Sequence, residues 1–305
     1  MGMPRVLTLL PFLLGGLAAA HGGEDHAAGF DWPVALGLLA LALAYALGLR
    51  ILWRRAGVGG GVAVWRALAF AGGVLALALA LLTLDPRADG SLAWHMLQHM
   101  LLIVVAAPLL VLGTPLYVLG WTLPLGTRRA AARAWNRSPG LPILGRGLTH
   151  PVLVWVLATA VFWGWHVPRL YEAAADNGAL HALEHLSFLG SSGLFWWALL
   201  QPQGRRTLAR GAGVVYLFMT VLQGSLMGAL LVFSRAPLYP EYAAHAVAEG
   251  RSPLADQQLA GLVMWVPFDV VYLALAGAFF VQWWRDEEAA QRRRDPSVPS
   301  PEVRA

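Results

Sequence analysis

Long apolar runs separated by short polar segments cover the chain from residue 33 to residue 284. An α-helix that crosses the hydrocarbon core of a bilayer needs about 20 predominantly apolar residues. Seven runs reach or approach that length, and a polar or basic segment follows each of them. The pattern predicts an all-α membrane protein built as a bundle of seven transmembrane helices, over residues 33–53, 62–84, 92–119, 151–165, 179–200, 213–233 and 259–284.

The start of the chain has the three parts of a secretory signal peptide, with Arg5 before the apolar run 6–17 and three alanines at 18–20. We therefore predict a signal peptide over the first 20 residues and cleavage before His21. Residues 21–32 then form a periplasmic segment that contains histidine and acidic side chains. A short additional membrane helix is the alternative, but a run of about 12 apolar residues is short for a span.

Arginine is distributed asymmetrically between the predicted loops. Clusters follow the first, third, fifth and seventh apolar runs, at 54–55, 128–146, 205–210 and 285–294, whereas the other loops carry scattered arginines only. Basic residues mark the cytoplasmic loops of membrane proteins. The N-terminus is therefore predicted outside the membrane and the C-terminus inside, and residues 285–305 are expected to form a disordered cytoplasmic tail.

Composition supports a membrane protein and excludes several activities. Hydrophobic residues make up 58% of the chain and charged residues 13%, which leaves too little polar surface for a soluble domain of 305 residues. The formal net charge of +5 arises from the arginine clusters, so it indicates topology and not a nucleic-acid partner. The absence of cysteine excludes disulfides, thiolate metal sites and thiol redox chemistry. A soft-metal site in this chain must therefore use histidine and methionine.

Two His-x-x-x-His pairs, His95 with His99 and His181 with His185, are the candidate chemistry of the chain. Residues four apart lie one above the other on a helix face, so each pair points two imidazoles in one direction. The predicted topology places both pairs within a few turns of the outer membrane surface, and His166 ends the fourth span at the same surface. Five histidines are therefore expected in one layer of the outer leaflet.

A metal ion would give these imidazoles a common partner. Neutral histidine is tolerated in a bilayer only where its polar atoms are satisfied, so each could instead bond a neighbouring helix. Imidazole binds copper, zinc, iron and nickel, and thioethers favour Cu(I). Met96 and Met100 flank the first pair and Met264 lies near the outer end of the last span, although methionine more often serves packing. These donors favour copper over haem or zinc.

Four further residues are weaker accessory candidates. Asp269 lies near the middle of the last span, where a carboxyl is either protonated and hydrogen-bonded or part of an ion path, and Gln223 is its possible partner. His245 lies in the longest outer loop and could join or cover the site, but a solvated loop histidine is the favoured interpretation. After the predicted cleavage, the amine and imidazole of His21 could chelate copper, with His26 close enough to add a nitrogen; a solvated acidic tail is the alternative.

The histidine segments resemble a known family. Residues 94–102, with the sequence WHMLQHMLL, and the later Pro108, Gly113 and Pro115 are similar to the signature of the multi-spanning CtaG family of cytochrome c oxidase assembly factors. The segments 166–174 and 181–197, which contain HALEHL, resemble its second block. The similarity covers roughly residues 33–284, and the paired histidine blocks are its specific part.

The resemblance implies a bacterial plasma-membrane protein that is needed to mature a haem-copper oxidase. It implies oxidase subunits and a periplasmic copper donor as partners, and it carries over onto five residues: His95, His99, His166, His181 and His185. An unrelated single-span copper chaperone shares the family's name but uses cysteines, so this cysteine-free chain is not that protein.

We therefore expect a copper-binding assembly factor, not an enzyme, with four histidine ligands and His166 as a fifth ligand or gate. One alternative is a copper permease that passes the ion toward the cytoplasm by way of Met219, Met227, Gln223 or Asp269. The other is a haem-binding membrane oxidoreductase, because histidines on facing helices can ligate haem. Transmembrane haem electron transfer usually needs histidines at two depths, and here the set lies at one.

Overall fold

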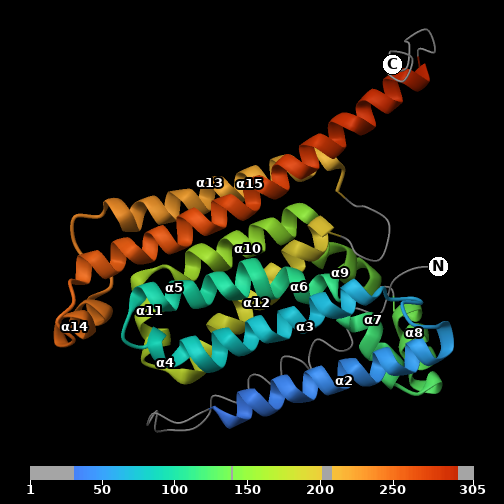
Figure 1. Cartoon of the computed structure of the whole chain (residues 1–305), viewed down its shortest axis with the longest axis horizontal. Coiled ribbons are helices and arrows are strands. Elements are labelled where there is room, and N and C mark those ends of the chain that lie inside the picture. The colour runs from blue at the N-terminus through green and yellow to red at the C-terminus, as the bar shows by residue number, and fades with distance from the viewer. Residues whose placement is uncertain (1–30, 139, 201–207, 295–305) are drawn as a thin grey trace.

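The computed structural model describes residues 31–138, 140–200 and 208–294, and within these ranges the chain is helical with no strand. The helices lie roughly parallel in an elongated bundle (Figure 1). The first half contains α2 (Trp32–Ala56), α3 (Val64–Ala78), the π-helix η2 (Leu79–Leu84), α4 (Asp85–Ala88), α5 (Leu92–Met100), the π-helix η3 (Leu101–Ala106), α6 (Ala107–Leu112), α7 (Pro115–Leu119), the 3-10 turn η4 (Gly120–Thr122), α8 (Leu125–Arg137) and α9 (Gly140–Leu148).

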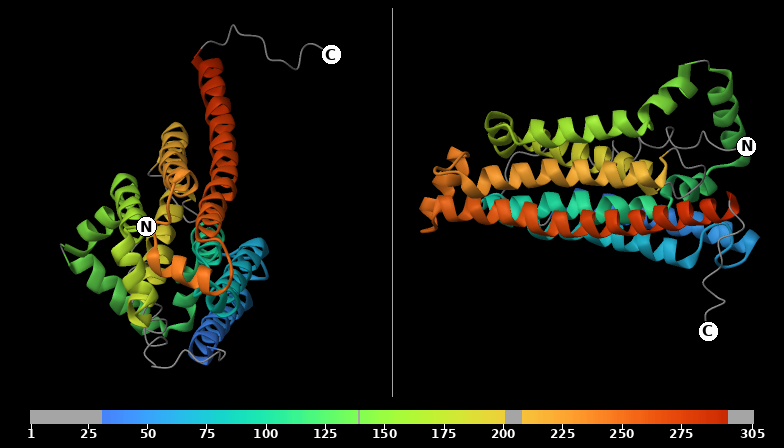
Figure 2. Two further views of the ribbon diagram at one scale, coloured as in Figure 1. Left: turned by 90° about the vertical axis from the view of Figure 1, so that its left-hand side faces the viewer. Right: turned by 90° about the horizontal axis from the view of Figure 1, so that it is seen from above.

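The second half contains α10 (Pro151–Trp165), α11 (Pro168–Ala175), α12 (Gly178–Leu200), α13 (Arg210–Phe233), α14 (Pro240–Ala248) and α15 (Pro253–Arg294). The helices α13 and α15 run side by side along the bundle (Figure 2). Glycines allow this close approach, because a Cβ atom added at Gly261 would lie 2.9 Å from the carbonyl oxygen of Gly228.

Five segments of the described chain are helical, long and apolar enough to cross a membrane, at Trp32–Ala56, Val64–Ala88, Leu92–Leu112, Arg210–Phe233 and Pro253–Arg293. The helices α10 and α11 form a sixth candidate if the pair, bent by 73°, counts as one span. The all-α membrane architecture is confirmed, whereas the count of seven spans and the orientation remain predictions. The remaining predicted span is α12, where two histidines and Glu184 interrupt the apolar run.

Three helix boundaries differ from the sequence-based expectation. The third span was expected to run to residue 119, but α6 ends at Leu112, and Thr114 takes a left-handed backbone conformation at φ 50° before Pro115 starts α7. The outer loop before the last span contains α14. The last helix continues past residue 284 to Arg294, so the first part of the tail expected to be disordered is helical. The predicted signal peptide and the segment 21–30 lie outside the described residues.

Helix α12 carries a few polar side chains in an apolar sequence, and neighbouring helices cover many of its residues. Trp196 is almost completely buried, and its indole Nε1 donates a hydrogen bond of 2.8 Å to the carbonyl oxygen of Ile103 in η3. The Tyr272 ring of α15 packs against Trp196 with 5.2 Å between ring centroids. These contacts fix the α12 face that carries histidines against the helix that carries the first histidine pair.

Candidate metal centre

Two helix starts position the histidine pairs at one end of the bundle. At the start of α5, the Asp256 carboxylate from α15 accepts hydrogen bonds from the Leu92 backbone N–H (2.8 Å) and the Ser91 hydroxyl (2.7 Å). At the start of α12, the Asn177 side chain accepts from two backbone N–H groups, those of Ala179 and Leu180. Because a polar cap at each helix start satisfies exposed N–H groups, both helices begin one turn before their first histidine.

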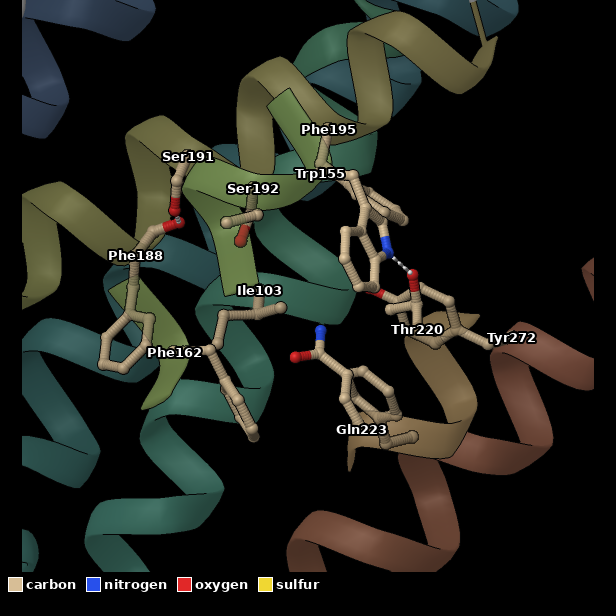
Figure 3. Close-up of a pocket in the computed structure, with 12 residues that line it drawn as sticks. Ile103, Trp155, Phe162, Phe188, Ser191, Ser192, Phe195, Thr220, Gln223 and Tyr272 are labelled. Carbon is tan, nitrogen blue, oxygen red and sulfur yellow. Dashed lines mark hydrogen bonds between the residues drawn. The ribbon is translucent and has the colours of Figure 1, made fainter. Parts of the chain in front are cut away.

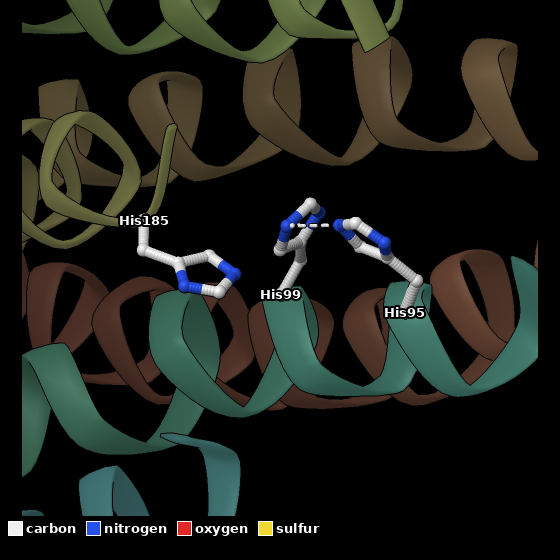
Figure 4. Close-up of side chains that lie close together, drawn as sticks. All are labelled: His95, His99 and His185. Atoms are coloured by element: carbon white, nitrogen blue, oxygen red, sulfur yellow. Dashed lines mark hydrogen bonds between the residues drawn. The ribbon is translucent and has the colours of Figure 1, made fainter. Parts of the chain in front are cut away.

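The centre of the site is a histidine triad made by His95 and His99 of α5 and His185 of α12 (Figure 4). One ring nitrogen from each residue lies within 4.8 Å of the others, and the Nε2 atoms of His95 and His99 are 3.0 Å apart. All three side chains are buried, and His99 is fully inaccessible to solvent. We call these three residues the inner triad.

Glu184 adds a carboxylate that the sequence analysis did not assign to the site. Its side chain is fully buried, and one oxygen lies 3.7 Å from His95 Nε2 while the other lies 3.7 Å from His99 Nε2. Neither oxygen has a hydrogen-bond partner in the described part of the chain. A carboxyl inside a membrane helix is a functional candidate in itself, and its place between His181 and His185 in the sequence could have identified it.

The other two predicted histidines have different positions. His181 joins His95 and Glu184 in a second group whose donor atoms lie within 4.8 Å of one another, and its Nε2 atom has no hydrogen-bond partner among the described residues. His166 is buried at the corner between α10 and α11, where its Nδ1 lies 2.6 Å from the Phe162 carbonyl oxygen. Four of the five predicted histidines therefore cluster, and His166 lies beside the cluster without joining these groups.

Three tyrosines pack beside the site and are called the tyrosine cover: Tyr171 of α11, Tyr239 at the N-cap of α14, and Tyr242 of α14. The Tyr242 hydroxyl lies 2.6 Å from His95 Nδ1, and the Tyr239 hydroxyl donates to the backbone carbonyl of His166 at 3.0 Å. The ring centroids of Tyr171 and Tyr242 are 5.5 Å apart. Burial raises the pKa of Tyr242 above its ordinary value, so the phenol stays neutral beside His95.

The accessory candidates lie elsewhere. Met96, Met100 and Met264 are buried in the hydrophobic core, which is the ordinary role of methionine. His245 is exposed on α14, which agrees with the favoured interpretation of a solvated histidine. Asp269 accepts a hydrogen bond of 2.6 Å from Ser225, not from its expected partner Gln223.

His21 and His26 lie outside the described residues.

A small cavity of about 30 Å³ is lined by residues of η3, α10, α12, α13 and α15 (Figure 3). Phe188 lines this cavity and also packs against the site, with 4.7 Å between the ring centroids of Phe188 and His99. Its ring therefore lies between the cavity and the histidines. The polar side chains that line it come from Ser191, Ser192, Thr220 and Gln223. A cavity of this size has room for about two water molecules, and its hydroxyl and amide lining lacks the soft donors that copper prefers.

Comparison with known proteins places the chain among membrane assembly proteins. The family model described as cytochrome c oxidase caa3 assembly factor matches residues 43–286. The Uncharacterized protein Mb0105 of Mycobacterium bovis is 28% identical over 277 residues, which are 89% of this chain and 41% of that protein. The Uncharacterized protein MT0111 of Mycobacterium tuberculosis matches with the same identity and coverage. The chain thus spans less than half the length of these relatives, and no solved structure matches it.

Proposed function

The chain belongs to the family of cytochrome c oxidase caa3 assembly factors, and on that premise we propose that its inner triad binds copper and delivers it to an oxidase subunit during maturation. The observation that carries the proposal is the inner triad, three buried imidazoles whose nitrogens lie within 4.8 Å of one another. Oxidase subunits are partners by virtue of the family, and a periplasmic copper donor is the partner that the delivery step requires.

The donor set suits copper as a cargo. Imidazole is a good ligand for copper, and a carboxylate beside three imidazoles offsets the positive charge of the ion. An ionised carboxylate that is buried without a partner is costly, and a bound cation is the partner that Glu184 lacks in the described chain. We propose that the ion leaves by ligand exchange, because a delivery site has to release what it binds.

We propose that the site faces the periplasm or cell exterior of a bacterial plasma membrane. The short helices α4, α11 and α14 lie at the site's end of the bundle, whereas α8 lies at the opposite end (Figure 1). Helix α8 carries Arg128, Arg129, Arg133 and Arg137, and the last turn of α2 carries Arg54 and Arg55. Arginine clusters mark the cytoplasmic side, so this separation supports an outward-facing site.

Transport into the cytoplasm fits this architecture less well than delivery on the outer side. The cavity next to the site is closed off from His99 by Phe188 and is lined by hydroxyl and amide groups. In the described residues, the Asp269 carboxylate accepts a hydrogen bond from the Ser225 hydroxyl, and Asp269 does not line that cavity. An ion that left the inner triad inward would therefore meet no series of strong ligands.

Metal analysis of the purified wild-type chain tests the proposal directly. We expect about one copper ion per chain from the single inner triad, and no Soret band in the absorption spectrum, because copper and not haem is bound. Cells that lack the chain should contain oxidase protein without its full complement of copper. A copper-free wild-type protein together with a fully metallated oxidase in the deleted strain would contradict the delivery role, and a Soret band would favour the haem alternative.

Changing Tyr242 to phenylalanine should weaken copper binding moderately. When His95 binds an ion through Nε2, its Nδ1–H can donate to the Tyr242 oxygen, which lies 2.6 Å away. Loss of such a supporting hydrogen bond typically lowers metal affinity by about 10-fold to 100-fold. The measurement is a competition titration with a copper chelator. Tyr239→Phe is the matched control, since its hydroxyl bonds a backbone carbonyl and not a ligand; equal affinities of wild type and Tyr242→Phe would contradict this role.

A further inference from the structure

We propose that Asp85, His181 and His185 form an outer cation site that receives copper first and passes it to the inner triad by ligand exchange at His185. The inference rests on the proposed function, because it takes the inner triad as the destination of the ion. The donor atoms of these three residues lie within 4.8 Å of one another. We call them the outer triad.

The two triads differ in their access to solvent. Asp85 and His181 are half-buried, whereas every member of the inner triad is buried. Tyr242 of the tyrosine cover contacts Nδ1 of His95, which belongs to the inner triad. Asp85 of the outer triad takes no part in that contact. An ion that arrives from solution or from a donor protein would therefore meet the outer triad before the inner one.

The carboxylate of Asp85 is held in place by the helix that carries the inner triad. Gln98 is fully buried on α5 between the two histidines, and its amide nitrogen donates to Asp85 Oδ1 at 2.5 Å and to the Ala80 carbonyl oxygen at 3.1 Å. This contact fixes the carboxylate beside the histidines and leaves Oδ2 for a cation. The π-helix η2, which ends at Leu84, brings Asp85 into reach of α5.

The shared residue His185 makes a stepwise transfer possible. A neutral imidazole has one nitrogen with a free lone pair, so it ligates one ion at a time. An ion bound by Asp85, His181 and His185 can therefore exchange ligands for His95 and His99 while it stays bound to His185. The group of His95, His181 and Glu184 lies on the same path, since it contains a member of each triad. The ion keeps donor atoms throughout, which avoids the cost of a bare charge in an apolar interior.

Rapid-mixing experiments with cuprous and cupric ions on the purified full chain separate the two triads. The variant Asp85→Asn removes the charge but keeps an oxygen that can accept the Gln98 hydrogen bond. We expect its copper-loading rate to fall about 10-fold, because a carboxylate at the entrance raises the capture rate of cations. The equilibrium affinity and the amount of one copper per chain should stay close to wild type. Glu249→Gln is the matched control, since it removes an equal charge from an exposed residue outside both triads.

A trapping variant provides the second measurement. His99→Leu removes one ligand of the inner triad only, so we expect the protein to bind one copper ion more weakly, and the combination of His99→Leu with Asp85→Asn to lose that ion. Loading of Asp85→Asn at the wild-type rate, or equal copper binding by His99→Leu with and without Asp85→Asn, would overturn the outer triad while leaving the delivery function in place. A wild-type chain that binds no copper would instead overturn the proposed function.

Discussion

Replacing His95 and His99 together by alanine is expected to remove copper from the purified protein and from the oxidase made in the same cells. The two Nε2 atoms are 3.0 Å apart and supply two of the three nitrogens of the inner triad. Loss of a residue that only supports a ligand already costs about 10-fold to 100-fold in metal affinity, so loss of two ligands should cost at least about 100-fold to 10,000-fold by the same scale. An ion left in the outer triad would be held too weakly to survive desalting.

The measurement is the copper content of the desalted protein beside that of the oxidase from the same membranes. The control is His150→Ala combined with His245→Ala, which also removes two histidines but from exposed positions outside the cluster. We expect the control to keep about one copper per chain. Equal copper in the cluster variant and the control, with a fully metallated oxidase in both strains, would show that the cluster is not the delivery site.

The helical periodicity of the sequence was sufficient to predict that the histidines cluster. The spacing of four residues in each pair requires both imidazoles to lie on one helix face, and the apolar runs around them require the helices to pack together. The first statement depends on local sequence alone, and the structure brings His95, His99, His181 and His185 together. The depth of each pair along its helix could be predicted from helix geometry, whereas the packing of α5 against α12 that joins the two pairs is a long-range contact.

The parts that the sequence did not predict depend on contacts between distant segments. Tyr242 reaches His95 across 147 residues, and no periodic pattern marks that contact. Asp85 lies nearly 100 residues before the second histidine pair, and the folded chain brings its carboxylate beside that pair, where Gln98 donates a hydrogen bond to it. The break after α6 depends in part on Gly113, where an added Cβ atom would lie 2.5 Å from the Cβ atom of Phe70 on α3.

Changing Glu184 to glutamine is expected to lower copper affinity strongly while leaving every histidine in place. The two carboxylate oxygens lie 3.7 Å from the Nε2 atoms of His95 and His99, so a bound ion would lie close to the negative charge. Two unit charges about 4 Å apart attract by about 4 kcal/mol at an effective dielectric constant of about 20. Since about 1.4 kcal/mol corresponds to a factor of ten, the affinity for Cu(I) should fall by several hundred-fold or more.

The charge argument also makes a prediction about oxidation state. The Coulomb energy is proportional to the charge of the ion, so Glu184→Gln should reduce the affinity for Cu(II) more than the affinity for Cu(I). Parallel titrations with the two ions, under oxidising and reducing conditions, measure both losses. Glu184→Asp should recover part of the affinity because it keeps the charge on a shorter side chain, and Glu249→Gln, at an exposed residue of the outer loop, should change neither value. If Glu184→Gln lowers both affinities equally and Glu184→Asp recovers nothing, Glu184 acts through packing and not through its charge, and the site is an all-histidine centre.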